Sequence, residues 1–200
     1  MKNLKVKMIS PFGPSIGKFT LSKAMINEFN QTCDLIAEDE MLSKKLDVSN
    51  GLAGKVRQEI SIPTEIISNY AIYFNGLIST YLKEINKMPS SIEGMASNQN
   101  IMPARAIVGT HIAASWFVRS FSGDYNPVHV HPDATISCVG YLKVPDWKEE
   151  LEQDKKDHHG LTHGCLTFLF GGITALSRHQ LVIRPKVGDF YVFPGWLQHT

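Results

Sequence analysis

The stretch Gly123-Asp124-Tyr125-Asn126-Pro127-Val128-His129-Val130-His131-Pro132-Asp133 is the part of the sequence that decides the fold. Gly123 and Asn126 favour a turn before the two histidines, and Pro132 ends regular strand pairing after them. Residues two apart on a strand point to the same face, with Cα atoms roughly 6–7 Å apart, so two imidazoles placed in this way can bind one metal ion. The stretch therefore predicts a short strand that presents two metal ligands.

A third ligand is offered by Phe193-Pro194-Gly195-Trp196-Leu197-Gln198-His199, far downstream. We expect His129, His131 and His199 to form a mononuclear iron site, with coordination positions left open for other ligands. The alternative interpretation is structural, with the paired histidines lying on the surface or in a loop and hydrogen bonding to water.

Runs of β-branched and aromatic residues separated by Gly, Pro and Asp follow in the second half of the chain, which is typical of an antiparallel sandwich or barrel. These runs cover residues 104–110, 111–121, 134–144, 165–170, 179–184 and 190–193. The interval 145–160 carries many charges of both signs and is predicted to be a solvated excursion, either a tolerated insertion or a lid over the site.

The first half of the chain predicts two amphipathic helices. One covers residues 22–38, with Ser22 as its N-cap, and the other begins near Pro63 and runs to about Lys87. Residues 88–100 are polar and read as a connector. We therefore expect one domain over residues 1–200 with an α+β fold, in which a mainly helical support region, 1–100, precedes a β core, 101–200.

The composition of the chain argues against some classes of binding partner. Lys and Arg number 20 against 19 Asp and Glu, a net charge of +1, which argues against binding to nucleic acid or to an anionic membrane. Cys33, Cys138 and Cys165 are odd in number and widely spaced, so they predict neither a disulfide framework nor a Cys-based metal site. Without a leader or an apolar run of membrane-spanning length, a cytoplasmic protein is expected.

Three further stretches of the sequence are similar to those of a known protein family. They are Ile136-Ser137-Cys138-Val139-Gly140-Tyr141-Leu142-Lys143-Val144-Pro145, Gly164-Cys165-Leu166-Thr167-Phe168 and the closing run from Arg184 to His199. With them, residues 115–199 resemble the 2-oxoglutarate- and Fe(II)-dependent oxygenases of the prolyl-hydroxylase-like branch. This resemblance implies a double-stranded β-helix core of the jelly-roll or cupin-like kind, Fe(II) and 2-oxoglutarate as cofactors, and dioxygenase activity on a small-molecule or peptide substrate.

The sequence departs from this family at the metal ligands. The family's triad is His-x-Asp/Glu with a distal His, and His131 stands where the acid is expected. Asp133 is an alternative acid ligand, because positions 129, 131 and 133 would share one face of an extended strand. Pro132 favours His131 by bending the chain before Asp133, and both assignments stay open at this point.

A second departure concerns the co-substrate. The family binds the far carboxylate of 2-oxoglutarate with an Arg on the strand after the distal His, whereas this sequence ends at Thr200. We therefore expect a chain truncated at its C-terminus, inactive if that strand is truly lacking, with an unpaired sheet edge through which a homodimer can form. Tyr141 and Ser137 are the candidate residues for binding 2-oxoglutarate. The alternative interpretation of Tyr141 is a core residue of the barrel.

Two other functions compete with the hydroxylase. A cupin-type dioxygenase that needs no 2-oxoglutarate would also use Gly-x5-His-x-His and a three-histidine iron site. A non-catalytic β-sandwich binding protein would use the same histidines structurally.

Overall fold

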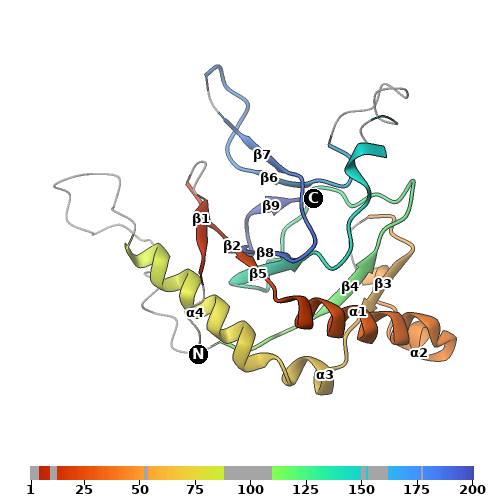
Figure 1. Ribbon diagram of the computed structural model, residues 1–200. Helices are drawn as coiled ribbons and strands as arrows, with labels where there is room; N and C mark the ends of the chain where they lie inside the picture. The colour runs from red at the N-terminus through yellow and green to blue at the C-terminus, as the bar shows by residue number, and fades with distance from the viewer. Residues whose placement is uncertain are drawn as a thin grey trace.

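The computed structural model describes residues 5–9, 13–51, 54–87, 110–149, 152, 162–176 and 178–200. It has a mixed α+β architecture, with N-terminal helices and antiparallel sheets (Figure 1). The predicted strand at 104–110 lies outside these residues except for Thr110, as do the connector 88–100 and most of the interval 145–160. Within the described part of the chain, no helix has the length and apolarity needed to cross a membrane.

A four-stranded antiparallel sheet lies at the centre of the molecule, in the order β1-β2-β8-β5. Its strands are β1 (Lys7–Ile9), β2 (Ile16–Thr20), β8 (Asp189–Pro194) and β5 (Ile136–Gly140). Because side chains alternate along a strand, β8 serves two cores: Phe190 and Val192 face the helices, and Tyr191 and Phe193 face a second sheet.

Helices cover one face of this sheet (Figure 1). The long helices α1 (Lys23–Glu38) and α4 (Ala71–Lys87) contribute Ile26, Leu77 and Tyr81 to the core against Phe190 and Val192. The shorter helices are α2 (Glu40–Lys45) and α3 (Thr64–Ser68), and a 3-10 turn covers Ser49–Gly51. The predicted first helix is confirmed, including its cap, since the Met25 amide donates to the Ser22 hydroxyl.

The prediction of one continuous helix from about Pro63 to Lys87 is wrong. The chain ends α3 at Ser68 and makes a tight turn in which the Tyr70 amide donates to the Ile67 carbonyl. Tyr70 then packs on Phe29 of α1, with ring centroids 4.6 Å apart, before α4 starts. α3 and α4 pack in different parts of the core, Ile66 beside Ile60 and Leu77 beside Phe190, and this packing overrides the helical periodicity that runs through both segments.

The second sheet has the order β7-β6-β9 and is also antiparallel. Its strands are β6 (Leu166–Leu169), β7 (Gln180–Ile183) and β9 (Gln198–His199). Leu166, Phe168 and Leu197 pack against Tyr191 and Phe193 of β8, so the two sheets enclose a second core. The runs predicted at 134–144, 165–170 and 179–184 therefore contain β5, β6 and β7, and the run at 190–193 lies within β8.

A two-stranded ribbon completes the fold beside α1. It pairs β3 (Gln58–Ser61) with β4 (Trp116–Arg119), and β4 is the strand found within the predicted run 111–121. One face of the ribbon buries Ile60 and Phe117 against Cys33 and Ile36. The opposite face carries Ser61 and Trp116, which are paired in register.

Candidate metal centre

Backbone pairing brings the two histidine-bearing segments together. The His129 amide donates to the His199 carbonyl over 2.9 Å, and the His199 amide donates to the His129 carbonyl over 3.1 Å. Residues paired in this way project their side chains from the same face of a sheet. His131 is fixed nearby, because its amide donates to the carbonyl of Gly195, in the turn before β9, over 2.8 Å.

The three imidazoles converge. Ring centroids are 4.3 Å apart for His129 and His199, and 5.1 Å apart for each of the two other pairs. One ligand atom from each ring lies within 4.8 Å of the others, and the Nε2 atoms of His131 and His199 are 3.2 Å apart. His199 is buried, whereas His129 and His131 are partly exposed, so the cluster is open on one side.

Two carbonyls determine which nitrogen of each ring faces the cluster. The Pro127 carbonyl lies 2.9 Å from Nδ1 of His129, and the Leu197 carbonyl lies 2.8 Å from Nδ1 of His199. A carbonyl only accepts, so each Nδ1 carries the proton and each neutral ring keeps an unprotonated Nε2. Metal-binding histidines are oriented by this kind of contact.

Burial favours the neutral form of His199 and His131. The pKa of His199 is lowered to about 4, mainly by burial and to a smaller extent by the neighbouring His129 and His131, against the opposing effect of the Leu197 carbonyl. Burial also lowers the pKa of His131, with a smaller contribution from His129. Because metal ions bind the neutral imidazole, the lone pairs are available near neutral pH.

Aromatic rings line the buried side of the cluster. The ring centroid of His199 is 4.8 Å from that of Phe193 and 6.3 Å from that of Phe168. On another side, the Trp116 ring lies 5.7 Å from that of His131. These contacts give the three nitrogen donors a largely apolar setting.

The alternative acid ligand lies elsewhere. Asp133 is exposed, in a turn that includes Pro132 and is closed by a hydrogen bond from the Ala134 amide to the His131 carbonyl. His129 forms an isolated bridge with His199 rather than part of a longer strand, and among the described residues Asp133 does not join the three converging histidines.

The two candidate residues for binding 2-oxoglutarate lie on the inner side of the central sheet. Ser137 pairs in register with Phe193, and the ring centroid of Tyr141 lies 6.3 Å from that of Tyr191. Burial, reinforced by Tyr191, raises the pKa of Tyr141, so its hydroxyl stays protonated and can donate. Their role in binding the co-substrate stays a prediction.

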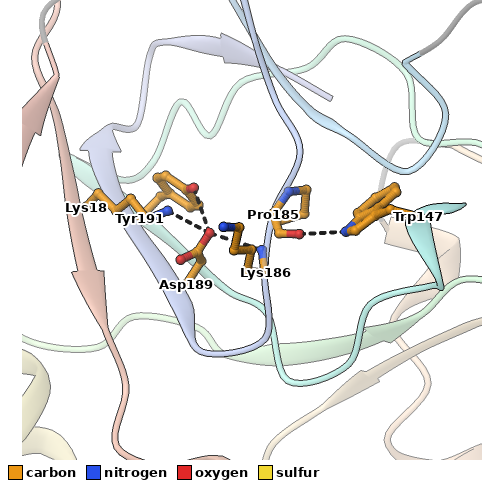
Figure 2. Close-up of polar contacts among 6 residues, drawn as sticks. All are labelled: Lys18, Trp147, Pro185, Lys186, Asp189 and Tyr191. Carbon is orange, nitrogen blue, oxygen red and sulfur yellow. Dashed lines mark hydrogen bonds and ion pairs between the residues drawn. The ribbon is translucent and has the colours of Figure 1, made fainter. Parts of the chain in front are cut away.

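Sequence reasoning missed a polar cluster in the same interior. Figure 2 shows Lys18, Lys186 and Tyr191 gathered around Asp189, whose Oδ2 accepts from Lys18 Nζ at 2.7 Å, the Lys186 amide at 3.0 Å and the Tyr191 hydroxyl at 3.1 Å. Asp189 is only 6% exposed. Lys18 and Asp189 are 171 positions apart, so no local pattern links them. The one feature that could have indicated this cluster is the position of Lys18, a charged residue on the same face of its strand as the fully buried Ile16.

A second contact in Figure 2 fixes the start of the interval 145–160. Trp147 Nε1 donates to the Pro185 carbonyl over 3.0 Å, and the Arg184 guanidinium lies 5.5 Å from the Trp147 ring. Arg184 is exposed. The start of the interval is therefore held against the segment that follows β7.

Comparison with known proteins agrees with the resemblance seen in the sequence. No curated protein and no solved structure matches the chain. A family model does match residues 114–200, and the family is described as "Putative 2OG-Fe(II) oxygenase". The matched segment contains His129, His131 and His199 together with β4 to β9. Residues 114–200 thus form a match to the 2OG-Fe(II) oxygenase family, which confirms the resemblance over this part of the chain.

Proposed function

We propose that the chain is an Fe(II)- and 2-oxoglutarate-dependent dioxygenase that hydroxylates a small-molecule or peptide substrate. The observation that carries the proposal is the convergence of three imidazoles, two with their Nε2 atoms set by carbonyl contacts, within a segment that matches this family. The two facing antiparallel sheets, with His129 bridged to the edge of the second one, support a double-stranded β-helix core.

The donor set fits a divalent iron ion. Neutral imidazole is a good ligand for Fe(II), and three protein ligands leave coordination positions open on the exposed side of His129 and His131. The Pro127 and Leu197 carbonyls orient two of the rings, while Phe168 and Phe193 keep water from the buried side. When bound, Fe(II) and 2-oxoglutarate supply the oxidising power for hydroxylation of a C–H bond.

The inner side of the central sheet provides groups for the two carboxylates of 2-oxoglutarate. Tyr141 and Ser137 are the hydroxyl donors. Lys18 adds a positive charge, and its ammonium, which donates to Asp189, has two further N–H groups. Arg184 is exposed and lies over Trp147, so Lys18 is the better candidate for the cation that the far carboxylate needs.

One observation favours a second candidate. Three histidines without a carboxylate are the donor set of a dioxygenase that binds its substrate directly and uses no 2-oxoglutarate, and Asp133 lies outside the cluster. The site's net charge is then one unit more positive than with the usual acid. Whether 2-oxoglutarate binds at the metal separates the two candidates.

Anaerobic titration tests the proposal. The protein is loaded with Fe(II), 2-oxoglutarate is added, and a visible metal-to-ligand charge-transfer band is expected. His199→Ala should abolish the band, and His111→Ala, which removes an exposed histidine, should leave it unchanged. Iron binding without the band would favour the dioxygenase that needs no 2-oxoglutarate. Absence of iron binding by the wild-type protein would contradict both candidates and leave the non-catalytic binding protein.

A further inference from the structure

A pocket of about 290 Å³ lies between the end of β3, the start of α3 and residues 112–116. Its lining contains no charged side chain and is largely aliphatic, with Val48, Ile62 and Ile67 among its members. The hydroxyls of Ser61 and Ser115 also line it, but both donate to backbone carbonyls, those of Ser115 and Ile62. Thr64, an exposed residue, adds a third hydroxyl to the lining. The pocket is therefore uncharged and mainly apolar.

Trp116 connects this pocket to the candidate metal centre. It lines the pocket and pairs in register with Ser61, on the face of the β3–β4 ribbon opposite to Ile60 and Phe117. The same indole ring lies 5.7 Å from the His131 ring. Trp116 thus borders both the pocket and the histidine cluster.

We propose that this pocket binds an uncharged, apolar end of the substrate, whose reactive carbon extends past Trp116 to the metal. The inference rests on the proposed function and deepens it by naming the substrate class. A charged group in the pocket would lose its hydration without gaining a partner, which is strongly unfavourable. The volume lies at the lower end of the roughly 300–1,000 Å³ of small-molecule sites, which suits one ring system or a short branched hydrocarbon.

Two dyes with the same ring system test the selectivity. N-phenyl-1-naphthylamine is neutral, and 8-anilinonaphthalene-1-sulfonate carries an added negative charge. Fluorescence titration should show one site for the neutral dye and at least tenfold weaker binding of the sulfonate. Ala114→Phe fills the pocket from an exposed position outside any helix or strand and should weaken binding of the neutral dye at least tenfold. Ala113→Phe is the second variant should the first fail to fold.

Ala175→Phe is the matched control, since Ala175 is also exposed and lies outside the pocket lining. It should leave dye binding unchanged. Equal binding of the two dyes, or equal effects of Ala114→Phe and Ala175→Phe, would overturn the inference.

Proximity to the metal is tested with the neutral dye by NMR. Mn²⁺ at the histidine cluster should broaden the dye protons strongly, and Zn²⁺ should not. Mn²⁺ binding without broadening of a bound dye would overturn the inference and leave the proposed function standing. Normal dye binding by a protein that binds neither ion would instead contradict the metal centre, and with it both proposals.

Discussion

At the scale of single residues, the candidate metal centre depends on a contact that occurs twice. His129 and His199 each contact the carbonyl of the residue two positions earlier through Nδ1. The orientation of each of these two imidazoles is therefore set within its own segment and does not require contact with the other segment. The long-range element is the backbone pairing of His129 with His199, which sets the two rings side by side.

The third ligand can be assigned by comparing two substitutions. His131→Ala removes a ring that converges with the others, so affinity for Co²⁺ should fall on the order of 100-fold. Asp133→Ala removes an exposed carboxylate and should leave affinity nearly unchanged. Isothermal titration calorimetry measures both. A larger loss for Asp133→Ala than for His131→Ala would make Asp133 the ligand.

Acid should destabilise the metal-free protein through His199. The pKa of His199 is lowered from 6.5 to about 4 in the folded state. Between these two pH values, His199 is therefore protonated in the unfolded chain but largely neutral in the folded chain. The contribution to the free energy of unfolding is complete above pH 6.5 and is lost as pH falls toward 4. At about 1.4 kcal/mol per pH unit, the loss is on the order of 3 kcal/mol.

Urea unfolding across this window provides the measurement, with His199→Gln as the comparison. The variant should show a shallower decline of unfolding free energy with falling pH. Identical pH dependence in the two proteins would show that His199 is not a buried neutral base.

The residues of the cluster could be predicted from the sequence, but their surroundings could not. His129 and His131 form a local pattern, and His199 belongs to a run that resembles a family. The proton positions on their rings depend on the Pro127 and Leu197 carbonyls, whose directions follow from backbone geometry. Lys18 and Asp189 meet only because β2 pairs with β8.

At the scale of elements, the turn between β8 and β9 positions the site. Gly195 lies in this turn, and a Cβ there would collide with the Ala134 carbonyl and lie 3.0 Å from the His131 carbonyl. Its own carbonyl accepts from the His131 amide. The absence of a side chain at Gly195 therefore allows the turn to pack directly on the segment that carries His131.

Gly195→Ala should therefore damage both stability and the site. The collision is with backbone, which cannot rotate away, so we expect a loss of more than about 2 kcal/mol in unfolding free energy and weaker Co²⁺ binding. Gly172→Ala is the control, since a Cβ at Gly172 would meet nothing within 4 Å. Chemical denaturation and calorimetry measure the two effects. Wild-type behaviour of Gly195→Ala would contradict the close packing of this turn.

Local signals account for the elements that the sequence predicts well. Ser22 and the apolar positions after it predict α1 because a cap and a helical stripe are both local features. β2 has five residues, two of them Gly17 and Lys18, and it is a strand because β8 pairs with it. The break between α3 and α4 likewise depends on the contact of Tyr70 with Phe29 in another helix.

At the scale of the whole molecule, the central sheet and the core beneath the helices are each built from parts of the chain that are distant in sequence. β2, from the N-terminal region, and β5 flank β8 in the central sheet, and the core on its outer face needs Leu77 and Tyr81 of α4. The segment that matches the oxygenase family supplies β5 and β8 of the central sheet, whereas β1, β2 and the helices α1 and α4 precede it. It is therefore expected to depend on the preceding residues for its fold.

A fragment of residues 114–200 tests this dependence. Without β2 and α4, both Phe190 and Val192 would be exposed to water and one edge of β8 would be unpaired. The fragment should give poorly dispersed NMR spectra and no cooperative thermal unfolding, in contrast to the 200-residue chain. A well-dispersed spectrum would show that the family-matched segment folds alone.

The ion pair between Lys18 and Asp189 should also stabilise this long-range arrangement. Lys18→Met leaves the Asp189 carboxylate buried with two hydrogen bonds, and removal of one partner of a buried pair costs up to 3–5 kcal/mol. Because the Lys18 side chain is 28% exposed, we expect about 2 kcal/mol. Lys44→Met, in the exposed pair with Glu40, should cost less than about 0.5 kcal/mol. If urea denaturation shows equal losses of unfolding free energy for Lys18→Met and Lys44→Met, the ion pair with Asp189 does not stabilise the fold.

The position of β8 between β2 and β5 also bears on how the protein is made. A ribosome synthesises both flanking strands before β8, so the nascent chain holds two strands whose shared neighbour does not yet exist. Such unpaired edges are templates for aggregation. Completion of the sheet must wait until β8 has left the exit tunnel and inserted between them.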